Sequence, residues 1–170
     1  MISSGRFALI TGLLLSAATV TQAQNFRVPE RYSFDSPEAY HKYDKDILKC
    51  VNWLEKTPPG EDDEHVKRAG RFLLEWLTGC PYVRFTTNVR IDAFLSDSPE
   101  YRIYYMGGWA KYALESKQVK PDRRLCTYAG IKTVIKVYQS TSHAKKDANI
   151  EELVKMDEQS KLHAWVDERS

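Results

Sequence analysis

The stretch Glu100–Ser116, EYRIYYMGGWAKYALES, decides the fold, because it reads as a helix with an aromatic side and a glycine pair in its middle. Its large rings recur at the three- and four-residue spacing that places side chains on one face of an α-helix. A glycine inside a helix costs about 1 kcal/mol relative to alanine, so Gly107 and Gly108 need a compensating interaction. The four aromatic residues of this face are Tyr101, Tyr105, Trp109 and Tyr112.

This face has two interpretations, a packing seam and a ligand site. Small pairs also lie within two other predicted helices, at Ala69–Gly70 and Ala129–Gly130, and close helix crossing is the simplest reason for all three pairs. The aromatic rings would then fill the space around the crossing. In the alternative, the aromatic residues line a groove for a sugar, a peptide or a flat cofactor, and the glycines let the ligand approach the backbone. We favour packing, because aromatic stripes at helical spacing are usually core.

Start and stop signals predict five helices. Ser36-Pro37-Glu38 and Ser98-Pro99-Glu100 each combine an N-cap hydroxyl, a proline and an acidic residue, which suit the first turn of a helix. Asn149, with Glu152 three residues later, predicts a capping box for the last helix. Residues 81–97 are ambiguous, since the segment 88–95 suits either a short helix or an extended segment. The predicted helices span about 36–54, 63–78, 98–117, 121–139 and 149–166.

These signals predict an all-α fold. We expect a single-domain bundle of about five helices over residues 35–170, built from two αα-hairpins and a C-terminal helix, with an extended segment over 24–34. Both hairpins begin with Asp-Ser-Pro-Glu and carry Ala-Gly in their second helix. We favour convergence on a good helix start over duplication as the explanation, because two short matches without wider identity do not establish duplication.

Residues 1–23 have the order of a secretory signal peptide. Arg6 is followed by an apolar run over 7–20 and then by Thr21-Gln22-Ala23, after which a signal peptidase would cut. The run is shorter than the roughly 20 residues of a membrane-spanning helix, so an uncleaved anchor is the weaker alternative. We expect a periplasmic or secreted protein of 147 residues without stable membrane insertion.

The charges are balanced overall but unevenly distributed. The chain has 25 Lys and Arg against 23 Asp and Glu, which gives no sign of a nucleic-acid partner. However, residues 111–146 hold nine basic and two acidic residues, whereas residues 35–64 hold nine acidic and four basic residues. Attraction between two faces of the bundle is one explanation, and a surface for an acidic partner is the other. The candidate partner-binding residues are Lys117, Lys120, Arg123 and Arg124.

Three cysteines remain after the predicted cleavage. An oxidising compartment favours one disulfide and one leftover thiol. In a hairpin of the first two helices, Cys50 and Cys80 would lie roughly 20 Å apart, beyond the reach of a disulfide. We therefore expect a Cys80–Cys126 disulfide and a buried free thiol at Cys50.

No motif for catalysis, a metal or a cofactor stands out. The four histidines are scattered and match no strong metal pattern, and Cys80 has no neighbouring histidine to suggest a nucleophile. His163 and Asp167 share a helix face and suit a surface pair. The sequence therefore predicts no metal and no cofactor, and it leaves catalysis undecided.

Two functional hypotheses follow from these patterns. The first is an exported interaction module, such as an inhibitor, an immunity-type protein or an assembly factor, that binds another exported protein. The second is a small periplasmic hydrolase or small-ligand binder with an aromatic pocket near Trp109.

Overall fold

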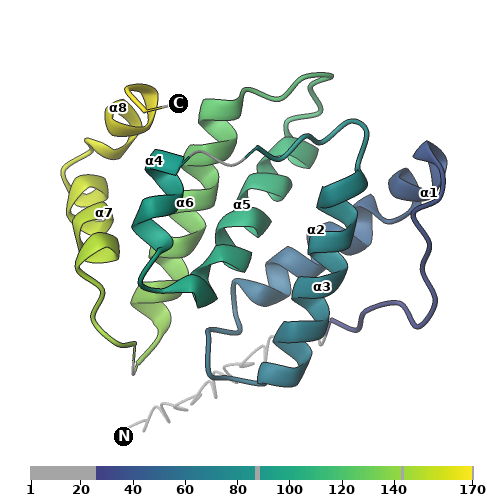
Figure 1. The fold of residues 1–170 in the computed structure, drawn as a ribbon, viewed down its shortest axis with the longest axis horizontal. Helices are drawn as coiled ribbons and strands as arrows, with labels where there is room; N and C mark the ends of the chain where they lie inside the picture. Colours follow the sequence, from purple (N-terminus) through teal and green to yellow (C-terminus); the bar gives the residue numbers. More distant parts are fainter. Residues whose placement is uncertain (1–25, 87–88, 143, 170) are drawn as a thin grey trace, which may run out of the picture.

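The computed structural model describes residues 26–86, 89–142 and 144–169, with the side chain of Asp92 excepted. These residues form helices joined by loops, and no β-strand occurs among them (Figure 1). The predicted all-α class is therefore confirmed. The predicted signal peptide, residues 1–23, lies outside the described residues.

The predicted number of helices is wrong, because the described residues form eight α-helices and two short 3₁₀ helices. The first predicted helix divides at Tyr43, whose amide bonds the Tyr40 carbonyl at 3.0 Å in a tight turn. The last one divides near Ser160, whose φ of 57° lies in the left-handed region. The α-helices are α1 (Pro37–Lys42), α2 (Asp44–Leu54), α3 (Asp63–Gly79), α4 (Val89–Asp92), α5 (Arg102–Glu115), α6 (Arg123–Ser140), α7 (Ala148–Glu158) and α8 (Leu162–Asp167), and the 3₁₀ helices are Ala93–Leu95 and Pro99–Tyr101.

The predicted N-cap at Ser36 is confirmed, and the helix predicted from about residue 121 also begins at a local cap. The Ser36 hydroxyl accepts a hydrogen bond from the Ala39 amide at 3.2 Å, as its position before Pro37 predicts. Asp122 caps α6 by accepting from the Arg124 amide at 2.8 Å. Local sequence is sufficient at these starts because the cap and its partner are two or three residues apart.

The start of α7 differs from the predicted capping box. Asp147, and not Asn149, is the N-cap, and one carboxylate oxygen accepts from the amides of Asn149 and Ile150 at 2.9 and 3.1 Å. Its other oxygen accepts from the Ser98 hydroxyl at 2.5 Å. Ser98 is thereby diverted from its predicted capping role, and the chain enters α5 through a 3₁₀ turn.

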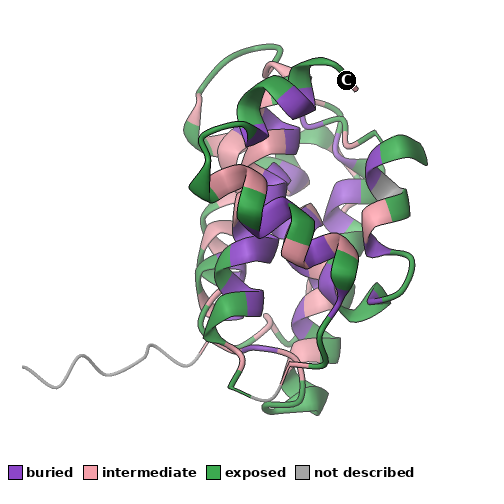
Figure 2. Cartoon of the chain, turned by 90° about the vertical axis from the view of Figure 1, so that its left-hand side faces the viewer, coloured by how far each residue is buried: buried purple, intermediate pink, exposed green. Residues whose placement is uncertain are grey.

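Helices α5 and α6 form the centre of the molecule (Figure 1). Helices α2 and α3 pack on one side of this pair, and α7 and α8 pack against α6 on the other side. Buried residues line the inward faces of the helices (Figure 2). The largest fully buried side chains are Trp76, Trp109, Tyr104 and Phe72.

The small residues of the central pair permit a close crossing. A β-carbon built on Gly108 would collide with the Thr133 side chain and lie 2.7 Å from the carbonyl oxygen of Ala129. A β-carbon on Gly130 would lie 2.7 Å from the carbonyl oxygen of Tyr105. Gly108 of α5 and Gly130 of α6 therefore form a packing seam, as the first interpretation predicts.

The predicted Cys80–Cys126 disulfide is wrong. All three cysteines, Cys50, Cys80 and Cys126, are unpaired and buried. Helix α5 packs against both α3 and α6 and lies between them (Figure 1), so it separates the end of α3 from the start of α6. The expectation failed because it assumed that these two ends meet directly. The thiol of Cys50 donates to the Ala69 carbonyl at 3.5 Å, which agrees with its predicted place as a buried free thiol.

Candidate functional site

The loop that joins α5 to α6 projects an apolar side chain between two basic ones. Val119 is 91% exposed and is the most exposed of the large apolar residues in the described chain. Lys117 and Lys120 flank it, are exposed themselves, and form no ion pair with any described residue. We call residues 116–122 the hairpin loop.

Both ends of the hairpin loop are fixed by hydrogen bonds. Ser116 donates its hydroxyl to the Ala113 carbonyl at 3.0 Å and accepts from the Gln118 amide at 3.4 Å. At the other end, Asp122 caps α6. The loop therefore presents its exposed tip from two anchored helix ends, which lowers the conformational entropy lost when a partner binds.

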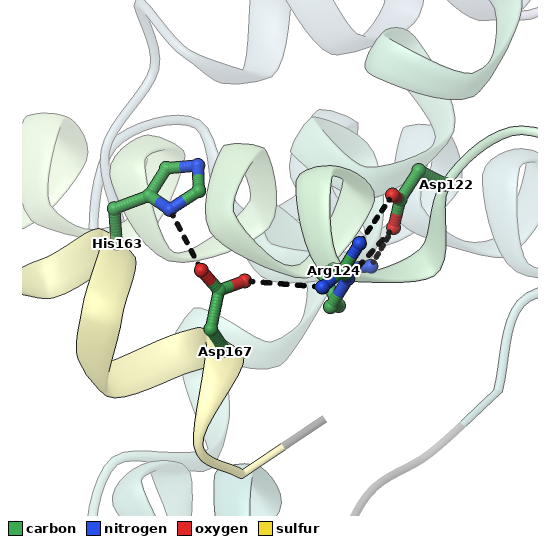
Figure 3. A network of polar contacts seen from close by, with 4 residues as sticks. All are labelled: Asp122, Arg124, His163 and Asp167. Atoms are coloured by element: carbon green, nitrogen blue, oxygen red, sulfur yellow. Dashed lines mark hydrogen bonds and ion pairs between the residues drawn. The ribbon is translucent and has the colours of Figure 1, made fainter.

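A chain of charged groups connects the loop with α8 (Figure 3). The Arg124 guanidinium lies 3.1 Å from one Asp122 oxygen and 3.9 Å from an Asp167 oxygen. The other Asp167 oxygen lies 3.2 Å from His163 Nδ1, which confirms the predicted surface pair. Hydrogen bonds from the Arg124 side chain and amide lower the pKa of Asp122. Arg124 is therefore a positioning residue, whereas Arg123 is exposed without an ion pair to a described residue.

A groove of about 430 Å³ lies over the α5–α6 crossing, next to the hairpin loop. Its lining includes Gly108 of the seam together with Ala129 and Thr133. Two half-buried tyrosines also line it, Tyr112 from α5 and Tyr128 from α6. Since the glycines bring the two helices together, the same seam that packs the core also shapes this groove.

One wall of the groove is supported from α8. The ring of His163 lies 5.1 Å from the ring of Tyr128, centroid to centroid. His163 is held by Asp167, which also meets Arg124. The charged chain of Figure 3 thus fixes both the start of α6 and the surroundings of Tyr128.

The far end of the groove contains a shielded carboxylate. Only 9% of the Glu55 side chain is exposed, and its two oxygens lie 3.0 Å from Lys111 Nζ and 2.5 Å from Lys136 Nζ. Lys111 also donates to the Asn52 side chain at 2.7 Å. Burial opposes ionisation of Glu55, but the hydrogen bonds from Lys136 and Lys111 outweigh it and hold the pKa of Glu55 below its ordinary value. These ion pairs join the acidic stretch 35–64 to the basic stretch 111–146, so attraction between faces of the bundle accounts for part of the uneven charge distribution.

A neighbouring hollow of about 400 Å³ continues from the groove. The two share Lys132 and Thr133, and the hollow extends to Lys136 and Gln139. Lys132 pairs with Asp157 of α7 at 2.5 Å. The groove and the hollow together form one continuous depression along the outer face of α6, with both apolar and polar groups in its lining.

Three of the four aromatic residues predicted to bind a ligand are buried. Tyr101, Tyr105 and Trp109 are each 2–3% exposed. The Trp109 ring packs edge-on against Phe85 at 5.4 Å, and its Nε1–H is buried without a hydrogen-bond partner among the described residues. Of the four, Tyr112 lines the groove.

Sequence reasoning did not single out most of the groove. A pattern that could have indicated its α6 side is the run of Tyr128, Lys132 and Lys136 at four-residue spacing, which forms a polar and aromatic face on a helix. Glu55 and His163 have no such local signal, because they lie far from this run in the sequence.

A second polar cluster lies at the corner between α1 and α2. The Tyr82 hydroxyl donates to Asp44 at 2.5 Å, and the His41 ring stacks on Tyr82 at 3.9 Å. His41 Nδ1 lies 3.1 Å from the other Asp44 oxygen. Burial raises the pKa of the adjacent Cys80 thiol against the hydrogen bonds that lower it, which argues against a reactive thiolate. The cluster fastens the segment after α3 to this corner.

The described residues contain no group of three or more His, Cys, Asp or Glu side chains arranged to hold a metal ion. None of their helices combines the length and apolar character needed to cross a bilayer.

A comparison of the chain with known protein families, curated proteins and solved structures finds no match.

Proposed function

We propose that this protein is an exported interaction module that binds another exported protein through its hairpin loop, as an inhibitor, an immunity-type protein or an assembly factor would. The observation that carries the proposal is the 91% exposed Val119 between Lys117 and Lys120, on a loop fixed at both ends. Export is proposed from the signal-like residues 1–23.

The chemistry of the loop favours a partner with an apolar pocket and an acidic rim. An exposed branched side chain gains free energy when a pocket removes it from water. Lys117, Lys120 and Arg123 form no ion pair with described residues, so their charges are available to a partner. Charges at the rim of an interface chiefly raise the association rate and select the partner.

The alternative function, binding of a small ligand, is proposed for the groove and no longer for a pocket at Trp109. Trp109 is buried, whereas the groove beside Tyr112 and Tyr128 is open at the surface. The groove is a second candidate binding site beside the hairpin loop.

Site-specific photo-crosslinking tests the proposed function. A photoreactive phenylalanine analogue at position 119, in the protein expressed in its own host, should give one discrete adduct in the envelope or medium. The control is the same analogue at Leu74, which is 48% exposed on α3. Native mass spectrometry of the purified protein should show the same second polypeptide.

The variant Lys117→Glu/Lys120→Glu separates binding from folding. It should retain the melting temperature of the parent, because both side chains are exposed, and it should reduce the adduct yield at least tenfold. Equal adducts at positions 119 and 74, or an adduct unaffected by the charge reversal, would contradict the proposal.

A further inference from the structure

We propose that the groove over the α5–α6 crossing binds a short neutral oligosaccharide. This site is separate from the hairpin loop, and its ligand is recognised by two tyrosine rings and by charged groups, most of which are paired with one another.

The shape and the apolar surfaces of the groove suit sugar rings. A groove of about 430 Å³ falls within the range of small-molecule sites. Pyranose rings have apolar C–H faces that pack on aromatic rings, and Tyr112 and Tyr128 offer such rings from two different helices. The adjoining hollow of about 400 Å³ gives room for further rings, which favours an oligosaccharide over a monosaccharide.

The charges of this face favour a neutral ligand. Acidic and basic residues in the groove and hollow are equal in number, so neither an anion nor a cation gains from net attraction. The acidic residues are Glu55, Glu115 and Asp157, and the basic residues are Lys111, Lys132 and Lys136.

The polar part of the lining contains both donors and acceptors, which matches the hydroxyl groups of a sugar. A hydroxyl both donates and accepts, and it can do both beside a carboxylate that is bound to an ammonium group. Lys111 uses two of its three N–H groups, for Glu55 and Asn52, and keeps one for a ligand. The Thr133 hydroxyl and the two tyrosine hydroxyls can each donate and accept.

The groove is preorganised before any ligand binds. Glu55 is fixed by two lysines, and Tyr128 packs against His163, which Asp167 holds in place. Less side-chain entropy is therefore lost on binding.

Saturation-transfer NMR tests the inference with defined probes. We would use the neutral disaccharides cellobiose, maltose, lactose and N,N′-diacetylchitobiose, with glucuronate and glucosamine as charged comparisons. Transfer to the C–H protons of at least one neutral disaccharide is expected, and it should exceed transfer to either charged sugar. No transfer to any disaccharide, or stronger transfer to a charged sugar, would overturn the proposal.

Two variants and one control locate the binding. Tyr128→Ser removes one wall, and Ala129→Phe fills the floor while keeping both walls; each should weaken saturation transfer at least tenfold. Tyr32→Ser changes another half-buried tyrosine that does not line the groove, and it should leave transfer unchanged. Unchanged transfer in both groove variants would contradict sugar binding in the groove. The loop variant Lys117→Glu/Lys120→Glu should bind sugar normally, so the two proposals can fail separately.

Discussion

Gly130 of α6 lies directly against the main-chain carbonyl of Tyr105 in α5. A β-carbon at Gly130 would lie 2.7 Å from that oxygen and 2.6 Å from Cδ2 of the Tyr105 ring. The relationship is reciprocal, because a β-carbon at Gly108 would lie 2.7 Å from the Ala129 carbonyl. Each helix thus places a glycine against the backbone of the other. The spacing of the pair, and with it the floor of the groove, depends on both glycines.

Gly130→Ala should destabilise the protein by about 1–3 kcal/mol, because a backbone carbonyl cannot move aside as a side chain can. This figure is the net change: the steric cost should exceed the roughly 1 kcal/mol that alanine gains over glycine in helix propensity. Urea denaturation followed by circular dichroism measures the change. Gly107→Ala is the control, because its β-carbon would meet the Val51 side chain at 3.3 Å and small shifts can relieve that contact. Equal stability of the two variants would contradict the seam.

Glu55→Gln should cost about 1–2 kcal/mol near neutral pH, because it leaves Lys111 and Lys136 without their shared carboxylate. Since the pKa of Glu55 is lowered from 4.5 in the folded protein, its ionisation stabilises the fold above that pH. This contribution is lost as the pH falls through the folded pKa. The difference between parent and variant should therefore shrink in acid.

The matched control for Glu55 is an exposed ion pair. Glu64 meets Lys67 at 3.4 Å with both side chains more than 70% exposed, so Glu64→Gln should change stability by less than about 0.5 kcal/mol. Denaturation curves at several values between pH 3 and pH 7 measure both variants. A Glu55→Gln effect that is independent of pH would contradict the assigned ion pairs.

The parts of the fold that local sequence predicted are those with local causes. The starts at Ser36 and Asp122 were predictable because each cap and its partner are neighbours in the chain. The glycines at the helix crossing were predictable, because a glycine inside a helix costs stability and close helix packing is the simplest compensation. The Asp147 cap is also local, because its partners are the amides of Asn149 and Ile150, and it was missed because Asn149 was taken as the start of the helix. The loss of the Ser98 cap could not be predicted, because the bond from Ser98 to Asp147 spans 49 residues.

Most of the candidate site could not be predicted, because its residues lie far apart in the sequence. Glu55 meets Lys111 and Lys136 across 56 and 81 residues, so no spacing rule could pair them. The hairpin loop was predictable as a basic stretch, but the sequence could not show that Arg124 is occupied by Asp122 and Asp167. The disulfide prediction failed on topology, since it left out the helix that separates the two cysteines.

Three free thiols should be found in the purified protein. Burial raises the pKa of Cys126 to about 12 and raises those of Cys50 and Cys80 as well. Ellman's reagent should therefore react slowly with the folded protein at pH 8, and it should titrate three thiols after denaturation. Mass spectra with and without a reducing agent should be identical. A mass lower by two hydrogens before reduction would show a disulfide and contradict the structure.

Arg124→Glu should lower the melting temperature more than Arg123→Glu does. Arg124 lies between Asp122 and Asp167, so a glutamate there would add a third negative charge. It would also break the charged contacts through which Asp167 and His163 support Tyr128. Arg123 is exposed without an ion pair to a described residue, so its reversal should leave the fold intact and act on partner binding alone. Thermal melts and crosslinking yields of both variants test this division. Arg124→Glu should also weaken sugar binding, since it removes support from one wall of the groove. Equal melting temperatures together with equal crosslinking yields would show that the two arginines have the same role, which would contradict the assignment of Arg124 as a positioning residue.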